Sequence, residues 1–296
     1  MPISLTALLL IIGATLSWSG LDTLRKLLAT RIKPIPLVIL LTLFQIPIFL
    51  AWVIFEGNFS SFSWSYFRYG LIAVVINILA NLMFVNAVRV SPFSLTIPFL
   101  SLTPIFATIW AIPILGEMPT LLQSIGILIA VFGAFNLNVA RGEGLNLKAM
   151  WRAFLNERGS VLMTGVAILW SLNSSVDKLS VTHASVAIHA LVQCAGIALG
   201  LLTVSAANGH LHELSNTRPH LKLLFGAVAF CALGLSFEFS AIQLAPIRMV
   251  AIIKRVVELN MAITIGRVIF KEQITRRKLL AIAMMAIGIV IIFWRN

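Results

Sequence analysis

The chain has 296 residues, of which 59% are hydrophobic and only 11% are charged. Soluble domains carry about 25% charged residues, so this composition excludes an ordinary water-soluble protein and indicates that lipid surrounds most of the surface. The net charge of +12 does not indicate nucleic-acid binding, because the basic residues cluster in short segments between apolar runs, where they act as topology signals and contact anionic headgroups.

Ten apolar segments are long enough to cross about 30 Å of hydrocarbon, which takes roughly 20 helical residues. We therefore predict an all-α polytopic membrane protein with ten transmembrane helices, at 4–24, 37–55, 67–89, 93–115, 120–139, 160–180, 185–206, 220–244, 247–269 and 276–294. Two of the connections are very short and contain a proline, Ser91-Pro92 and Ala245-Pro246, where helix breaks are expected. The first apolar run lacks the basic start of a signal peptide, so we expect it to be retained as a helix.

The longest connection, 140–159, mixes large apolar residues with basic ones. Their spacing suits an amphipathic helix that lies in the membrane interface. An ordinary linker fits the same composition, and the sequence alone does not separate the two interpretations.

The two halves of the chain repeat each other in three places. Residues 114–134 align with 269–289, so that Glu117 matches Glu272 and Gly133 matches Gly288. NAVRVSP at 86–92 resembles SAIQLAP at 240–246, and WSGLDTLRKL at 18–27 resembles WSLNSSVDKL at 170–179. The conserved order makes chance similarity a poor explanation.

An odd number of spans in each half inverts the second half relative to the first. Inverted repeats of this kind place a binding site near the bilayer midplane and permit alternating access. With the N-terminus outside, the inner loops hold most of the basic residues, and the outer side holds only Arg68, Lys178, Arg248 and Arg295. The positive-inside rule therefore favours both termini outside.

These duplicated segments resemble the drug/metabolite transporter superfamily, specifically its EamA-like branch. The resemblance rests on SPFSLTIPFLSLTPIF at 91–106, on Gly116-Glu117 with Gly126 and Gly133, and on the repeated tail FKEQITRRKLLAIAMMAIG. It implies a first EamA-like repeat at 1–140, a linker at 141–159 and a second repeat at 160–296, with a cavity walled mainly by the third, fourth, eighth and ninth helices. The chain departs from the pattern at Lys271, which replaces the glycine before Glu272, and at Ala281, which matches Gly126.

The ninth predicted span holds three charged residues, Lys254, Arg255 and Glu258. A charge at mid-bilayer costs about 2.5–3.5 kcal/mol on insertion scales, so such residues tend to be paired and functional. Glu258 is within one helical turn of both cations, and we expect the cluster to bind substrate, with the spare positive charge holding a carboxylate or phosphate. A purely structural ion pair is the alternative.

The eighth span contains Glu238, which either neutralises the spare cation or carries a proton; Glu258 is the second candidate for proton coupling. Asp177 and Lys178 close the sixth span, where interfacial anchoring is the expected role. Glu117 and Glu272 each precede a helix, and we expect them to interact with the helix dipole.

Polar and aromatic residues of other spans complete the candidate site. We expect Asn81, Thr103, Trp18 and Trp170 to contact substrate, although interhelical hydrogen bonding or interfacial anchoring also suits these residue types. The fourth span should kink near Pro98 and Pro104. The remaining polar candidates, Asn77, Asn86, His189 and Gln193, suit interhelical hydrogen bonds, with a proton relay as the alternative role of His189. Cys194 and Cys231 suit buried free thiols.

The leading hypothesis is a secondary transporter, an exporter or exchanger, of a small polar or amphipathic metabolite that is anionic or zwitterionic, such as an amino acid. No nucleotide-binding P-loop is present, and we expect no cofactor and no metal. A flippase for a phosphate-bearing lipid carrier is the closest alternative, and a channel or an integral membrane enzyme fits less well. We expect a multi-pass protein of the cell (inner) membrane, a monomer or homodimer, whose partners are its substrate and the lipid bilayer.

Overall fold

The computed structural model describes residues 4–57, 62–115, 119–138, 147–245 and 247–293, and within these ranges the chain is helical and contains no strand. Glu117 and residues 141–146 of the predicted linker lie outside these ranges. The helices are α1 (Leu5–Ala29), α2 (Pro34–Glu56), α3 (Tyr66–Val90), α4 (Phe93–Thr96), η2 (Ile97–Leu102), α5 (Thr103–Leu115), α6 (Leu121–Leu137), α7 (Leu147–Asn156), α8 (Arg158–Ser180), α9 (Val186–Ala207), η3 (Leu211–His220), α10 (Leu221–Leu244), α11 (Ile247–Val268) and α12 (Arg276–Phe293).

Seven of the described helical segments are long and apolar enough to cross a membrane. They are α1, α2, α3, the segment Phe93–Trp110, α8, α9 and α10. The protein is therefore a multi-pass α-helical membrane protein. The predicted total of ten remains a prediction, because α6 is apolar but shorter than these segments and α11 and α12 carry several charged residues.

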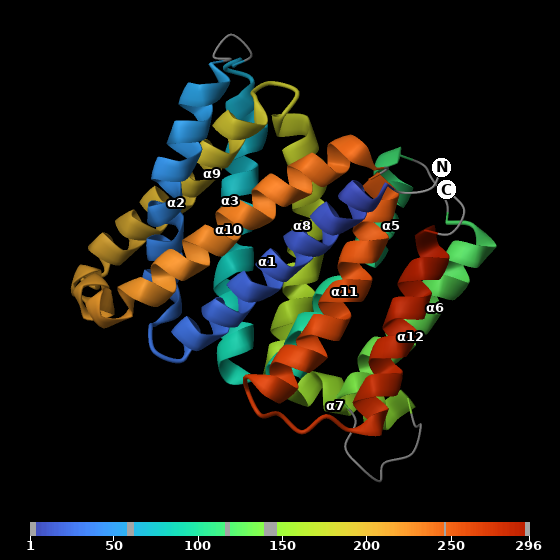
Figure 1. The fold of residues 1–296 in the computed structure, drawn as a ribbon. Helices are drawn as coiled ribbons and strands as arrows, with labels where there is room; N and C mark the ends of the chain where they lie inside the picture. Colours follow the sequence, from blue (N-terminus) through green and yellow to red (C-terminus); the bar gives the residue numbers. More distant parts are fainter. Residues whose placement is uncertain (1–3, 58–61, 116–118, 139–146, 246, 294–296) are drawn as a thin grey trace.

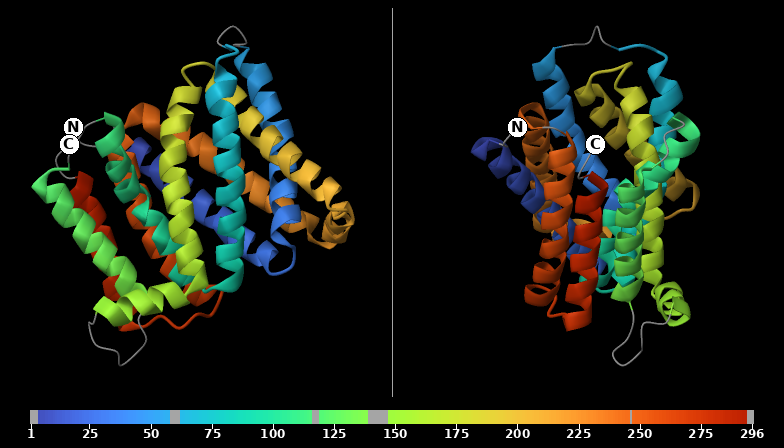
Figure 2. Two further views of the ribbon diagram at one scale, coloured as in Figure 1. Left: turned by 180° about the vertical axis from the view of Figure 1, so that it is seen from behind. Right: turned by 90° about the vertical axis from the view of Figure 1, so that its right-hand side faces the viewer.

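Eight of the long helices pack in four pairs, and each pair joins a helix of the first half to one of the second: α1 with α10, α2 with α9, α3 with α8, and α6 with α12 (Figures 1 and 2). If each helix is replaced by its counterpart in the other half, the same four pairs result. A hydrophobic core of buried residues runs between the pairs. Pairing across the halves brings α1, α2, α3, α8 and α9 around the centre of the molecule.

Small residues set the distance between α6 and α12. A Cβ on Gly126 would lie 2.7 Å from the carbonyl oxygen of Gly288, and one on Gly133 would lie 2.7 Å from that of Ala281. Backbones approach this closely only where the side chains are very small. Since Gly126 and Ala281 are repeat mates, and so are Gly133 and Gly288, the two contacts are related by exchange of the halves and show that α6 and α12 are antiparallel.

The predicted fourth span is broken rather than continuous. It starts as a single α-helical turn, α4, continues as the 3₁₀ helix η2, and returns to α-helix in α5. Pro98 and Pro104 lack an amide donor, so the regular hydrogen-bond ladder cannot run through them. The Oγ atoms of Ser101 and Thr103 instead donate to the carbonyl groups of Pro98 and Leu100, at 2.6 Å each. The kink expected from the prolines is present.

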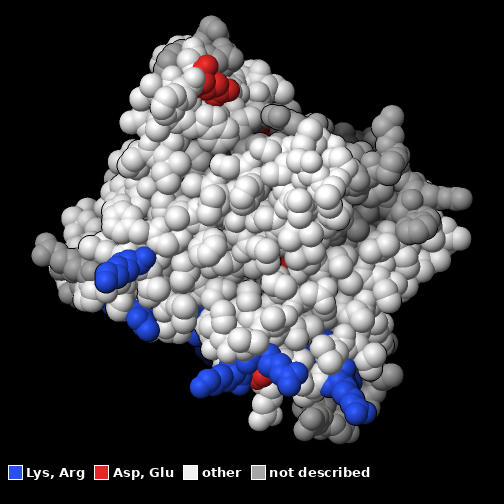
Figure 3. Space-filling model, in the orientation of Figure 1, with Lys and Arg blue, Asp and Glu red and all other residues white. Residues whose placement is uncertain are grey.

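The amphipathic helix considered for the connection is α7. Its Met150 and Phe154 are buried, whereas Trp151 and Leu155 are about half exposed, and Phe154 stacks on Phe99. The helix lies at the end of the molecule opposite to the start of α1 and the end of α12 (Figure 1). In the view of Figure 3 the Lys and Arg side chains gather towards the α7 end, as expected for helices that share one cytoplasmic side.

Candidate functional site

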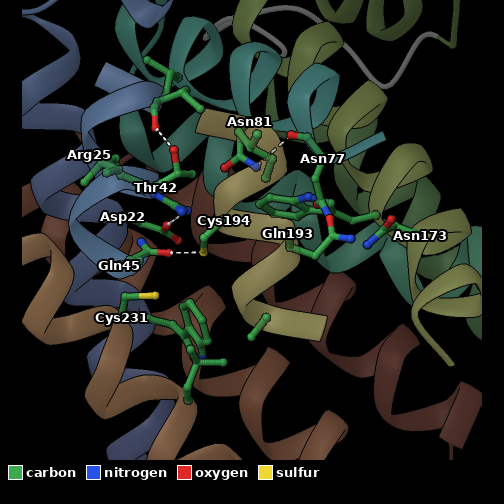
Figure 4. A pocket seen from close by; sticks show the side chains of 18 of the residues that line it. Asp22, Arg25, Thr42, Gln45, Asn77, Asn81, Asn173, Gln193, Cys194 and Cys231 are labelled. Atoms are coloured by element: carbon green, nitrogen blue, oxygen red, sulfur yellow. Dashed lines mark hydrogen bonds and ion pairs between the residues drawn. The ribbon is translucent and has the colours of Figure 1, made fainter. Parts of the chain in front are cut away.

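A cavity of about 510 Å³ lies between the helix pairs. Most of its lining comes from α1, α2, α3, α8, α9 and α11, whereas η2 contributes Leu100 and α10 contributes Cys231 and Leu235. The expectation from the family resemblance, that the third, fourth, eighth and ninth helices form most of the wall, is therefore wrong. The cross-half pairs α2–α9 and α3–α8 carry more of the lining because they flank the centre directly (Figure 4).

The charged residues of α11 line this cavity, but they pair differently from the prediction. Glu258 accepts a hydrogen bond from Nη1 of Arg255 at 2.7 Å. Nζ of Lys254 donates to both carboxylate oxygens of Glu238, at 2.7 and 2.9 Å. Glu258 therefore does not serve both cations, and Glu238 takes the neutralising position that the sequence left open.

Two further charges in the lining belong to α1, and the sequence analysis did not include them in the site. Asp22 and Arg25 face each other across one turn, with Nη1 and Oδ1 3.4 Å apart, and the guanidinium lies over the ring of Phe84 at 5.2 Å. Asp22 also interacts electrostatically with Lys254 and Glu258. In the described wall each lining cation now contacts a carboxylate, so the predicted spare positive charge is absent.

Both candidate tryptophans line the cavity. Nε1 of Trp18 donates to Oε2 of Glu238 at 2.7 Å, and Lys254 lies over the Trp18 ring at 5.3 Å. Trp170 packs against Phe84, with ring centroids 5.7 Å apart. An indole at these positions supplies an apolar face and a hydrogen-bond donor in the same wall.

The opposite wall is built from amides and from one carboxylate. Nδ2 of Asn77 donates to Oε1 of Gln193 at 3.2 Å, and Nδ2 of Asn81 donates to the Asn77 carbonyl at 2.8 Å. Asn173 donates to Asp177 at 2.6 Å. Asn77, Asn81, Asn173 and Gln193 are labelled in Figure 4, where they lie on the side of the cavity away from Asp22 and Arg25.

Asp177 lines the cavity, although interfacial anchoring was the role expected for it. Oδ1 lies 3.0 Å from Nε2 of His189, and Nδ1 of His189 lies 2.8 Å from the hydroxyl of Tyr66. Its repeat mate is Arg25, so the two halves place opposite charges at matching positions in the same cavity. The side chain of Lys178 is outside the description.

The cavity opens towards the end of the molecule away from α7. Val38, Val85 and Leu100, which line it towards the α7 end, are only 2–6% exposed, whereas the Asp177 side chain, near the other end of α8, is 37% exposed. The apolar end of the cavity is therefore shielded from water, and Asp177 at the other end is accessible.

Several other candidates lie outside this lining. Thr103 is half-buried and its hydroxyl donates to the Leu100 carbonyl, and Nδ2 of Asn86 donates to the Leu82 carbonyl at 2.9 Å.

The two cysteines are buried free thiols, as expected, and both line the cavity. Within the described ranges no group of three or more His, Cys, Asp or Glu side chains is placed to hold a metal ion.

Glu272 interacts with a helix start, but not with that of its own helix. Its Oε1 accepts from the amide of Phe93 at 2.5 Å and its Oε2 from the amide of Ser94 at 2.9 Å, so it caps α4 in the other half. Burial raises the pKa of Glu272, but hydrogen bonds from Ser94 and Phe93 and the charge of Lys26 outweigh this effect and hold the pKa below its ordinary value.

Sequence and structure comparisons agree with the repeat. The family model described as "EamA-like transporter family" matches residues 5–139 and again residues 157–294. One similar solved structure, described only as the crystal structure of a protein, has a TM-score of 0.55 and 16% identity over 96% of this chain and 95% of that one, which shows a shared fold. No curated protein sequence matches the chain. The chain belongs to the EamA-like transporter family of the drug/metabolite transporter superfamily.

Proposed function

We propose that this protein is a secondary transporter that carries a small zwitterionic metabolite, such as an amino acid, through the cavity by alternating access. Ten spanning helices in two inverted repeats, 1–140 and 160–296, would provide the framework. The α7 helix, which connects the repeats, would lie in the membrane interface. Inverted repeats allow the same site to face either side of the membrane.

The observation that carries the proposal is the concentration of charges of both signs inside an apolar bundle. The cavity lining holds three carboxylates and three cations, and Glu238 behind the lining pairs with one of the cations; the lining residues are Asp22, Asp177, Glu258, Arg25, Lys254 and Arg255. Ionised groups are costly at this depth, and a polar cargo that completes their hydrogen bonds explains why water-accessible charges are kept there.

The presence of carboxylates and cations in the same lining favours a zwitterion over a purely anionic cargo. Arg25 and Asp177 come from opposite halves, and amides separate them. A carboxylate near the guanidinium and an ammonium near Asp177 would each find an opposite charge. The walls of Trp18, Trp170 and Phe49 would contact an apolar side chain.

The first experiment is exchange of ¹⁴C-labelled amino acids in vesicles that contain the purified protein. Glu258→Gln should lower accumulation at least about tenfold, because it leaves the Arg255 guanidinium without its counter-ion in the cavity wall. Glu56→Gln is the matched control: Glu56 is an exposed residue at the end of α2, and this variant should transport normally. Undiminished transport by Glu258→Gln would remove the central cluster from the mechanism.

A further inference from the structure

A continuous arc of hydrogen-bonding side chains leaves the cavity wall, passes through the protein interior and returns to the wall. Asp177 begins it, 3.0 Å from His189, and His189 is 2.8 Å from Tyr66. Tyr66 also contacts the side chain of Gln193, which accepts from Asn77 and returns the arc to the cavity.

The middle members of the arc are buried, and its two ends are partly exposed. Tyr66 has no exposed surface, and His189 and Gln193 are 9% and 8% exposed, whereas Asp177 and Asn77 are part-buried residues of the cavity lining. A buried imidazole between a carboxylate and a hydroxyl can exist in two charge states without losing a partner. When neutral it accepts from the Tyr66 hydroxyl through Nδ1; when protonated it donates to that oxygen, and the hydroxyl hydrogen must turn away from the imidazole, which changes the surroundings of the Gln193 side chain.

The surroundings leave Asp177 and Tyr66 as the ionisable groups that contact this imidazole among the described side chains. Asp177 comes from α8 and Tyr66 from α3. Glu56 of α2 reaches α9 only through a 3.1 Å hydrogen bond from Ser185, which caps the helix. The other ionisable groups described near this end of α9 are the exposed Arg68 and the part-buried Tyr69 and His183, which stack on each other.

We propose that His189 and Asp177 form the proton-binding site of the transporter, and that protonation of His189 reorients Gln193 and Asn77 through Tyr66. This proposal rests on the proposed transport function and names its driving ion. Histidine changes charge near neutral pH, and buried networks transmit such a change through each hydrogen bond. The amide side chains that contact the cargo would then have different orientations when the proton is bound and when it is released.

A test that needs no cargo uses Cys194, which follows Gln193 in the cavity wall and is 7% exposed, so that its labelling rate reports how often the wall around it opens. Cys231→Ser leaves it as the sole cysteine, because the chain has two. The probe is a membrane-impermeant maleimide, whose rate is measured from about pH 5.5 to 8. Thiolate formation raises the rate in every variant, so the informative quantity is the ratio of the rate with His189 to the rate with His189→Gln.

We expect this ratio to change severalfold along a one-proton curve, and Asp177→Asn to move the curve to lower pH because the carboxylate no longer stabilises an imidazolium. His183→Gln is the matched control and should leave the curve unchanged. A constant ratio across the range, or an unmoved curve in Asp177→Asn, would overturn the proposal. The second variant decides the question if His189→Gln does not fold.

Transport measurements separate this proposal from the function on which it rests. With an amino acid that the protein exchanges, His189→Gln should still equilibrate cargo but lose accumulation driven by a pH gradient. Equal gradient-driven accumulation by both proteins would refute proton coupling through His189. If no cargo moves in any variant, the transport function fails, whereas the maleimide curve still reports whether His189 binds the proton.

Discussion

At the scale of single residues, Glu238 sits between two donors, Lys254 and Trp18, each 2.7 Å away. Removing only one charge of such a pair leaves the other without a counter-ion, which costs more than removing both. We expect Glu238→Gln and Lys254→Met each to lower the free energy of unfolding by about 1–3 kcal/mol, and the double variant to lose less than the sum. Thermal denaturation in detergent measures all four proteins, and strictly additive losses would show that the pair contributes no coupling.

The residues of this site differ in how well a sequence reveals them. Lys254, Arg255 and Glu258 stand out because charges in the middle of an apolar span are costly. Their partners do not, because Glu238 reaches Lys254 from the neighbouring helix, and helical spacing predicts only contacts within one helix. Arg25 and Asp177 lie near the ends of their spans, where charged residues are normally anchors.

At the scale of elements, the connection between α11 and α12 ties the second half to the first. Lys26 of α1 donates to the Ser91 carbonyl at 2.9 Å and lies 3.5 Å from Glu272, which caps α4. Lys271 has a φ of 53°, the left-handed conformation that glycine adopts most easily.

Glu272→Gln should therefore destabilise the protein in a pH-dependent way. We expect a loss of about 1–3 kcal/mol near neutral pH, because the glutamine would keep one acceptor oxygen but would lack the second acceptor and the negative charge that face the two amides and the Lys26 ammonium. The folded pKa of Glu272 lies below its ordinary value of 4.5, so its stabilisation is complete above that pH and disappears as the pH falls through the folded value. The gap in melting temperature between the native protein and the variant should shrink below about pH 4.5; Glu56→Gln should show no such gap, and a gap that persists unchanged in acid would contradict the assignment.

Secondary structure was predictable to the extent that hydropathy and proline determine it. Long apolar runs identify α1, α2, α3, α8, α9 and α10, and Pro98 and Pro104 identify the break in the fourth span. The 3₁₀ helix η3 between α9 and α10 has no apolar periodicity, so the hydropathy pattern does not show it. The packing of α4 against Glu272 was also hidden, because it depends on a contact 178 residues away along the chain.

At the scale of the whole molecule, the internal repeat carries more structural information than any single motif. It predicts the two matching halves, and the described contacts pair each long helix with one from the other half. It does not predict the cavity wall, because the departures between the halves, such as Arg25 against Asp177, determine the chemistry of the wall. Symmetry therefore specifies the framework, and its local violations specify the site.

The orientation of this framework follows from charge. The basic residues gather towards the α7 end (Figure 3), and that end should face the cytoplasm, because positive loops are retained there. The cavity would then open to the outside. Arg68→Cys and Arg152→Cys, both at exposed arginines, one in the first turn of α3 and one on α7, test this in a Cys194→Ser, Cys231→Ser background. In intact cells an impermeant maleimide should label Arg68→Cys, and it should label Arg152→Cys only after the membrane is permeabilised. The reverse pattern would show that the α7 end faces outside and that the cavity faces the cytoplasm.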